Sequence, residues 1–367
     1  MSDTALTRIN MDTEVTSARW TAEQAWNWHH LQPWRCGFNY VPSSAVNSIE
    51  MWQHETFDLP TMERELGWAQ ELGFNTCRIY LPFLLWRHEP KALLERVEQF
   101  LEIAEERGHK SVVVLFDDCD SVGHDPFLGF QGEPVPGRHN SRWTPSPGHR
   151  HATNRELWPD FEAYVSSVVG HFAQDERILM WDLYNEPGQS GMGEKSLPLL
   201  RDTFAWARAA HPHQPLTSGL HTGPPPNLGE IAGAVPVEGA QRLTDFMLSE
   251  SDIISFHDYG DLARLHRHVC ELKTLGRPLI CTEWLCRTHG SHIKTHLDVF
   301  KAEKIGCYFW GLVNGRTQTQ FPWGSPENAP DPDVWFHDLL RTDGTPYDEK
   351  EVALIQQALA SQQETQA

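Results

Sequence analysis

Basic side chains are scarce in this sequence of 367 residues. Thirty lysines and arginines stand against fifty aspartates and glutamates, which leaves a formal net charge of −20 at pH 7. A surface of this sign repels phosphate backbones and anionic lipids, so we expect neither a nucleic acid nor a membrane as partner. No run approaches the roughly 20 consecutive apolar residues that a membrane span needs. The first residues lack the basic start and apolar stretch of a secretion signal, which predicts a cytoplasmic protein.

Paired cysteines and metal-binding motifs are also missing. The seven cysteines form no CxxC pair and several lie in apolar runs, which favours buried free thiols in a reducing compartment. The twenty histidines include no HExxH, and no HxH follows the first strand-like run, so we expect no metal. Neither a glycine-rich phosphate loop nor a serine nucleophile elbow is evident, and we expect no organic cofactor.

What the sequence does contain is a regular alternation of strand-like and helix-like segments. Segments with helical spacing of apolar residues separate eight short runs rich in β-branched and aromatic residues, at 36–42, 76–83, 111–118, 178–186, 215–221, 252–259, 278–284 and 307–313. Eight such units predict an α/β fold, a (β/α)8 TIM barrel. The main alternative is a doubly wound open sheet, which favours a GxGxxG fingerprint after the first strand; residues 36–40 lack it.

The segments around this pattern suggest how the chain is organised. Residues 1–30 are predicted to be an N-terminal arm, 31–363 a single catalytic barrel domain and 364–367 a polar tail. Two long segments, 119–154 and 314–336, follow strands and therefore lie on the C-terminal face, where barrel enzymes build their sites. Their prolines and aromatic residues favour an ordered rim over a flexible linker.

Two of the predicted strands end in a glutamate. The fourth ends in Asn185 and Glu186, and Pro187 ends the strand because it cannot donate to a sheet ladder. The seventh ends at Glu283, three βα units further on, so the two carboxylates are expected to face each other across the barrel mouth. A lone glutamate at a strand end is more often solvated or salt-bridged, but a pair across a cleft suits glycoside hydrolysis.

With this arrangement the sequence resembles clan A of the glycoside hydrolases, and most closely the cellulase-like family 5. The likeness rests on Asn185-Glu186-Pro187 and on Glu283, and extends over about residues 35–340. It implies that Glu186 is the general acid/base, Glu283 the nucleophile, and Asn185 a hydrogen-bond partner of the sugar 2-hydroxyl. It also implies retention of anomeric configuration, with carboxyl groups about 5–5.5 Å apart.

The resemblance assigns four supporting residues. Arg78 would keep Glu283 ionised, and Tyr259 would orient it. His257 would contact the substrate or the acid/base, and Trp310 would floor the subsite of the cleaved sugar. The structural alternatives are a rim salt bridge for Arg78 and ordinary packing for the other three.

At the end of the third strand the sequence departs from the family. Members commonly carry a histidine there that contacts the sugar, whereas this chain has Asp117 and Asp118. Either His124, a few residues into the following loop, takes its place, or one of the aspartates grips sugar hydroxyls directly. Tryptophans expected outside the core, and therefore available to stack on pyranose rings, are Trp34, Trp52, Trp86, Trp143 and Trp323.

These residues predict a retaining β-glycosidase that acts on an oligosaccharide or small glycoside. A cytoplasmic enzyme meets imported oligosaccharides rather than polymer, and the two long loops are placed to close one end of the cleft. We therefore expect exo-action on small β-linked gluco- or manno-configured oligosaccharides. The alternatives are an endo-β-1,4-glycanase of cellulase or mannanase type, a non-catalytic carbohydrate-binding barrel, and a sugar lyase or isomerase. The sequence predicts no particular oligomeric state.

Overall fold

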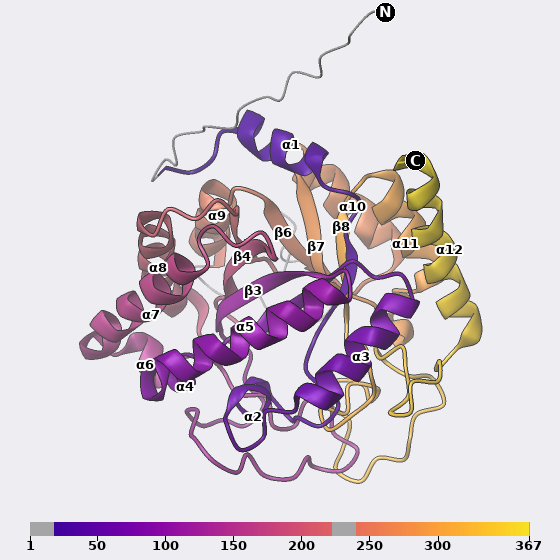
Figure 1. The fold of residues 1–367 in the computed structure, drawn as a ribbon, viewed down its shortest axis with the longest axis horizontal. Helices are drawn as coiled ribbons and strands as arrows, with labels where there is room; N and C mark the ends of the chain where they lie inside the picture. Colours follow the sequence, from indigo (N-terminus) through magenta and orange to yellow (C-terminus); the bar gives the residue numbers. More distant parts are fainter. Residues whose placement is uncertain (1–17, 222–239, 367) are drawn as a thin grey trace, which may run out of the picture.

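The computed structural model describes residues 18–221 and 240–366, and within them the sheet is an eight-stranded parallel barrel (Figure 1). The strands are β1 (Cys36–Asn39), β2 (Thr76–Tyr80), β3 (Lys110–Asp117), β4 (Ile178–Asn185), β5 (Leu216–Gly219), β6 (Ile254–Asp258), β7 (Leu279–Trp284) and β8 (Gly306–Trp310). They run in the order β5-β4-β3-β2-β1-β8-β7-β6. A parallel bridge between Leu220 and Phe256 joins the two ends of this order, which confirms the predicted (β/α)8 barrel.

Helices surround the strands (Figure 1). They are α1 (Ala22–Leu31), α2 (Ser48–Trp52), α3 (Leu59–Glu71), α4 (Phe83–His88), α5 (Pro90–Glu106), α6 (His149–Thr153), α7 (Trp158–His171), α8 (Leu197–Ala209), α9 (Ala240–Glu250), α10 (Leu262–Lys273), α11 (Ile293–Ala302) and α12 (Glu349–Gln366). Their apolar stripes explain the packing: α5 buries Leu93, Val97, Phe100 and Leu101 at helical spacing. None of the helices in the described ranges is both long and apolar enough to cross a bilayer.

Helix α1 lies within the segment that the sequence predicts to be an arm, and it packs on the floor of the barrel. Its Ala25 belongs to a buried cluster at the strand beginnings, and its Trp28, together with Trp20, packs against that cluster. The other members of the cluster are Val112, Leu179, Met180, Ile253, Ile280 and Tyr308. The backbone N–H of Trp20 donates to Asp252 at 2.8 Å, which ties this segment to the chain just before β6. Residues 1–17 of the predicted arm and residue 367 of the predicted tail lie outside the described residues.

At the opposite end of the barrel, two long loops, 118–148 after β3 and 311–348 after β8, are joined to each other. Asn140 N–H donates to the Thr317 carbonyl at 2.8 Å, and Asn328 N–H donates to the Pro136 carbonyl at 2.7 Å. Gly137 N–H donates to Gln318 at 3.0 Å. We call these joined loops the rim wall. The prediction of an ordered rim is confirmed by their contacts.

We expect Asp252→Ala to destabilise the fold. Asp252 is fully buried and accepts hydrogen bonds from Trp20, from Leu216 at 2.9 Å and from Arg208 at 3.2 Å. Removing the carboxylate leaves the buried guanidinium of Arg208 unpaired, at a cost of about 3–5 kcal/mol. Urea unfolding at pH 7 measures this loss. The exposed Asp298→Ala is the control and should change the unfolding free energy by less than about 0.5 kcal/mol; equal effects would contradict the expectation.

Candidate active site

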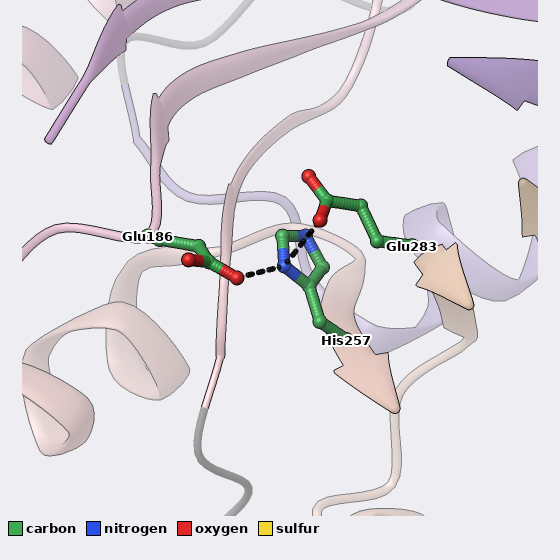
Figure 2. Close-up of side chains that lie close together, drawn as sticks. All are labelled: Glu186, His257 and Glu283. Atoms are coloured by element: carbon green, nitrogen blue, oxygen red, sulfur yellow. Dashed lines mark hydrogen bonds and ion pairs between the residues drawn. The ribbon is translucent and has the colours of Figure 1, made fainter. Parts of the chain in front are cut away.

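The two predicted glutamates meet at the mouth of the barrel. Glu186 follows β4 with a positive φ of 44°, and Glu283 is the fifth residue of β7. One oxygen of each carboxylate and one nitrogen of His257 lie within 4.8 Å of one another. Figure 2 shows the two carboxylates approaching from either side of the His257 ring. Glu186 is 8% exposed and Glu283 5%, so both carboxylates are largely withdrawn from solvent.

Glu283 is surrounded by hydrogen-bond donors. Arg78 donates from Nη1 to Oε1 at 2.9 Å, and Tyr80 donates from its hydroxyl to the same oxygen at 3.0 Å. Tyr259 donates to Oε2 at 2.7 Å. These donors stabilise the negative charge of the carboxylate and fix its orientation. Arg78 and Tyr259 thus lie where the sequence predicts them, and Tyr80 adds a donor.

Arg78 is buried completely and forms the base of the site. Its Nη2 donates to Asp182 at 2.8 Å and to the amide oxygen of Asn185 at 2.6 Å, and its Nη1 donates to Asn39 at 2.7 Å. Burial alone lowers the pKa of this guanidinium, but the charges around it, among them Asp182 and Glu283, outweigh burial and raise the pKa. A rim salt bridge, the alternative for Arg78, does not describe a side chain with no exposed surface.

Glu186 is paired with His257. The ring nitrogen Nδ1 lies 2.6 Å from Oε1 of Glu186 and 3.4 Å from Oε2 of Glu283. Burial raises the pKa of Glu186, but the hydrogen bond and the charge of His257 lower it below its ordinary value. Burial likewise lowers the pKa of His257, whereas the charge of Glu283 and the bond to Glu186 raise it. These shifts favour a pair that shares one proton across the 2.6 Å contact, with the carboxylate as acceptor and the imidazole as donor.

A glycine on the neighbouring strand makes room for the His257 ring. A Cβ at Gly219 would lie 2.9 Å from Nε2 of His257, so any side chain there would displace the ring from its present position. His221, two residues further, lies close enough for its protonated form to lower the pKa of Glu186, although burial lowers the pKa of His221 itself.

Asn185 is held by a network that starts at Asp117. Its amide nitrogen donates to Asp117 Oδ1 at 2.8 Å, while its oxygen accepts from Arg78. The second oxygen of Asp117 accepts from Trp143 Nε1 at 2.7 Å. Burial raises the pKa of Asp117 to about 7, although these donors oppose the rise. Asp117 therefore orients the amide of Asn185.

Asp118 holds the end of β4 and the loop that follows it in place through hydrogen bonds. It accepts from the Tyr184 hydroxyl at 2.7 Å, from Gly188 N–H at 2.7 Å and from the Ser196 hydroxyl. Its carboxylate is thus occupied by donors of the protein, and burial raises its pKa. His124, the other candidate from this part of the sequence, is exposed, and its Nδ1 lies 3.0 Å from the Asp125 carbonyl. The structure therefore does not bring His124 to the glutamates.

Aromatic rings form one side of the site. Trp310 is partly buried, and its ring centroid lies 5.6 Å from that of Trp143 and 6.1 Å from that of Tyr80, in edge-to-face arrangements. Trp323 is 47% exposed and lies 5.0 Å from the ring of Tyr259. Both predicted tryptophans therefore lie near side chains that contact Glu283.

The prediction that five tryptophans lie outside the core is wrong for three of them. Trp34 and Trp143 are buried, and Trp52 is completely buried, with its indole N–H donating to the Tyr80 carbonyl at 2.8 Å. Trp86 is partly buried and packs against Tyr164. Composition alone does not reveal which tryptophans pack inside, because strands and short loop helices both contribute to the core.

Sequence reasoning missed several residues of the site. Tyr80 and Asp182 carried a usable signal: Tyr80 lies two residues after Arg78 on the same strand face, and Asp182 is a charged residue in an apolar strand. Cys119 carried none, because it lies in a loop whose path no periodicity describes.

Glu186, His257 and Glu283 together present ligand atoms that could hold a metal ion. The same atoms pair with one another and with Arg78, Tyr80 and Tyr259, so a metal would have to displace these contacts. The donor set suits proton transfer between a carboxylate and an imidazole.

We expect His257 to titrate at a higher pH than free histidine, and Glu186→Gln to lower its pKa, since the neutral amide removes a negative charge that favours the imidazolium. NMR titration of the histidine ring measures both values. Glu156→Gln, at an exposed position, should leave the titration unchanged. A His257 pKa that is the same in wild type and in Glu186→Gln would contradict the shared proton.

Comparison with known proteins agrees with this geometry. Residues 37–315 match the model of the cellulase family, glycosyl hydrolase family 5. No curated protein is significantly similar to the chain.

Several solved structures share the fold. The exo-beta-1,4-mannosidase Op5Man5 from Opitutaceae bacterium strain TAV5 is similar with a TM-score of 0.59 and 15% identity, over 91% of this chain and 60% of that chain. This chain thus spans about three fifths of the length of that mannosidase. A GH5_18 protein from Streptomyces cattleya in complex with Manb1-4GlcNAc has a TM-score of 0.59 and 15% identity, over 90% and 80% of the two chains. An endo-beta-1,4-mannanase from Thermotoga petrophila has a TM-score of 0.58 and 15% identity, over 92% and 79%.

Proposed function

The chain belongs to the cellulase family, glycosyl hydrolase family 5, and on this basis we propose that it is a retaining β-glycoside hydrolase. The observation that carries the proposal is the approach of the Glu186 and Glu283 oxygens to within 4.8 Å. Retaining enzymes hold their carboxyl groups about 5–5.5 Å apart, whereas inverting enzymes leave about 6.5–9.5 Å for a water. Residues 31–363 form the catalytic domain in this proposal.

The mechanism is a double displacement. Glu283, oriented by its donors, attacks the anomeric carbon while Glu186 gives its proton to the departing glycosidic oxygen. Glu186, now a carboxylate, takes a proton from water, and the resulting hydroxide equivalent releases the sugar from Glu283. No metal or organic cofactor takes part in these steps.

His257 supplies the proton that Glu186 needs. In the free protein the shared proton rests on the imidazole, 2.6 Å from Glu186. A bound glycoside removes water from the site and places an ether oxygen beside Glu186, which favours the neutral pair of carboxylic acid and imidazole. The proton then moves along the existing hydrogen bond to Glu186.

Sugar recognition falls to groups beside the carboxylates. Asn185 exchanges its weakest contact, the one to Cys119 Sγ at 3.7 Å, for the sugar 2-hydroxyl, while Asp117 and Arg78 hold the rest of the amide. Trp310 provides the apolar floor of the subsite for the cleaved sugar, and Trp323 a stacking surface at the mouth. Asp117 and Asp118 hold other groups of the protein in place and do not bind sugar hydroxyls in this proposal.

The rim wall supports exo-action. Loop 118–148 carries Trp143, and loop 311–348 begins directly after Trp310. Both loops therefore lie beside the aromatic side of the proposed sugar site. Their mutual hydrogen bonds close that side, whereas Glu186, which protonates the leaving group, lies on the loop after β4. A substrate oligosaccharide that can extend only on the side of Glu186 loses one terminal sugar at a time. We therefore propose small β-linked gluco- or manno-configured oligosaccharides as substrates.

The state of the cysteines supports a cytoplasmic location. All seven are free, among them the exposed Cys270, as is usual in a reducing compartment.

Glu283→Ala tests catalysis against the alternative of a non-catalytic sugar-binding barrel. We expect wild type to hydrolyse an aryl β-glucoside or β-mannoside, and Glu283→Ala to lose more than about a thousandfold in kcat, since no nucleophile remains. A panel of aryl glycosides that differ at C2 and C4 identifies the sugar. The exposed Glu162→Ala is the control and should keep wild-type activity. A wild type without hydrolysis on the whole panel would overturn the proposal.

Gly137→Ala tests the wall. A Cβ at Gly137 would lie 2.4 Å from the backbone nitrogen of Ala329 and would force the two loops apart. On β-1,4-linked tetrasaccharides we expect wild type to release monosaccharide first and Gly137→Ala to release more di- and trisaccharide. Gly123→Ala is matched in φ, 72° against 78°, but its Cβ meets open space, so it should retain the wild-type product pattern. Early di- and trisaccharides from wild type would instead establish endo-action.

A further inference from the structure

Beside the acid/base lies a thiol that the proposed mechanism does not use. Cys119 follows β3 by two residues, is partly buried, and packs against the cluster of Tyr80, Val114 and Trp143. Its Sγ lies 3.2 Å from Oε2 of Glu186 and donates to that oxygen.

We propose that Cys119 is a positioning residue that fixes the acid/base carboxylate of Glu186 through this S–H···O hydrogen bond. The inference rests on the proposed function, in which Glu186 protonates the leaving group. His257 holds the other oxygen, Oε1, so the two donors together set the plane of the carboxylate and the direction in which its proton points.

The geometry of the loop keeps the thiol in place. The backbone N–H of Cys119 donates to Asp117 Oδ1 at 3.0 Å, and the same oxygen accepts from Asn185 at 2.8 Å. Through this one oxygen, Asp117 therefore orients both the Asn185 amide, which faces the sugar in the proposed function, and the Cys119 thiol, which faces Glu186. Gln189 donates to the same oxygen of Glu186 as the thiol, at 3.3 Å, but it approaches from the exposed loop after β4.

The chemistry of the surroundings keeps Cys119 protonated. Burial raises the pKa of the thiol, and the negative charges of Asp117, Glu186 and Glu283 raise it further. The thiol therefore acts as a donor, and not as a nucleophile that would compete with Glu283 for the anomeric carbon.

A comparison of Cys119→Ala with Cys119→Ser distinguishes a positioning role of the thiol from a packing role. On a disaccharide substrate we expect Cys119→Ala to lower kcat/KM about tenfold, the typical effect of one lost hydrogen bond. Cys119→Ser keeps a donor and should stay within about twofold of wild type. On a 2,4-dinitrophenyl glycoside, whose leaving group departs without protonation, both variants should match wild type, because kcat/KM reports only the first displacement. The exposed Cys270→Ala is the control and should behave as wild type on both substrates.

The pH profile gives a second readout. The first step needs the proton that Glu186 and His257 share, so the basic limb of kcat/KM follows the loss of that proton from the pair. The thiol hydrogen bond favours the charged carboxylate, so its removal makes the pair hold the proton more strongly and moves the basic limb of Cys119→Ala to higher pH. Equal losses for the alanine and serine variants, equal losses on both substrates, or an unmoved basic limb would each overturn the proposal.

A measurement without substrate keeps the inference distinct from the proposed function. The infrared S–H stretch of Cys119, isolated as wild type minus Cys119→Ala, should move to higher frequency in Glu186→Gln, because an amide oxygen is a weaker acceptor than a carboxylate. An unmoved band would overturn the hydrogen bond. A moved band in a protein that hydrolyses no glycoside would support the hydrogen bond while the proposed function fails.

Discussion

The site depends on the charge balance around the buried guanidinium of Arg78. Asp182 and Glu283 supply the two negative charges that face it, and the amides of Asn39 and Asn185 and the hydroxyl of Tyr80 accept its other hydrogen bonds. A cation without exposed surface is tolerated only with such partners. One side chain therefore holds Glu283, the amide beside Glu186 and the strands β1, β2, β4 and β7 that carry these groups. The other residues of the site, such as Tyr259 and His257, then orient the carboxylates of Glu283 and Glu186.

Much of the fold and the chemical core of the site could be predicted from the sequence. The barrel followed from alternating periodicities, and Glu186 and Glu283 from their position at strand ends, because a parallel barrel collects all carboxyl ends on one face. Arg78, His257 and Tyr259 came from a family likeness and lie beside the glutamates as expected. These residues share one property: each lies on or next to a strand, where the backbone fixes the direction of the side chain.

Residues in loops could not be placed in this way. His124 was a candidate for contact with the sugar but lies exposed, whereas Cys119, five residues earlier, reaches Glu186. Asp117 and Asp118 were candidates for binding hydroxyls but accept hydrogen bonds from the protein instead. The path of a long loop depends on contacts with segments far away in the chain, and these contacts leave no periodic signal.

The contacts between the two loops of the rim wall also affect the order in which parts of the protein fold. Pro136 and Asn140 bond to Asn328 and Thr317, residues nearly half the chain away, and β1 finds its second neighbour only in β8. Contacts of such long range form late, because closing a large chain segment is entropically expensive until the intervening elements have packed. During synthesis the strands that carry Arg78 and Glu186 leave the ribosome well before β8 and the loop that follows it. Nascent chains would therefore hold Arg78 and Glu186 before the rim wall exists, and the rim wall forms only when the last fifth of the polypeptide arrives.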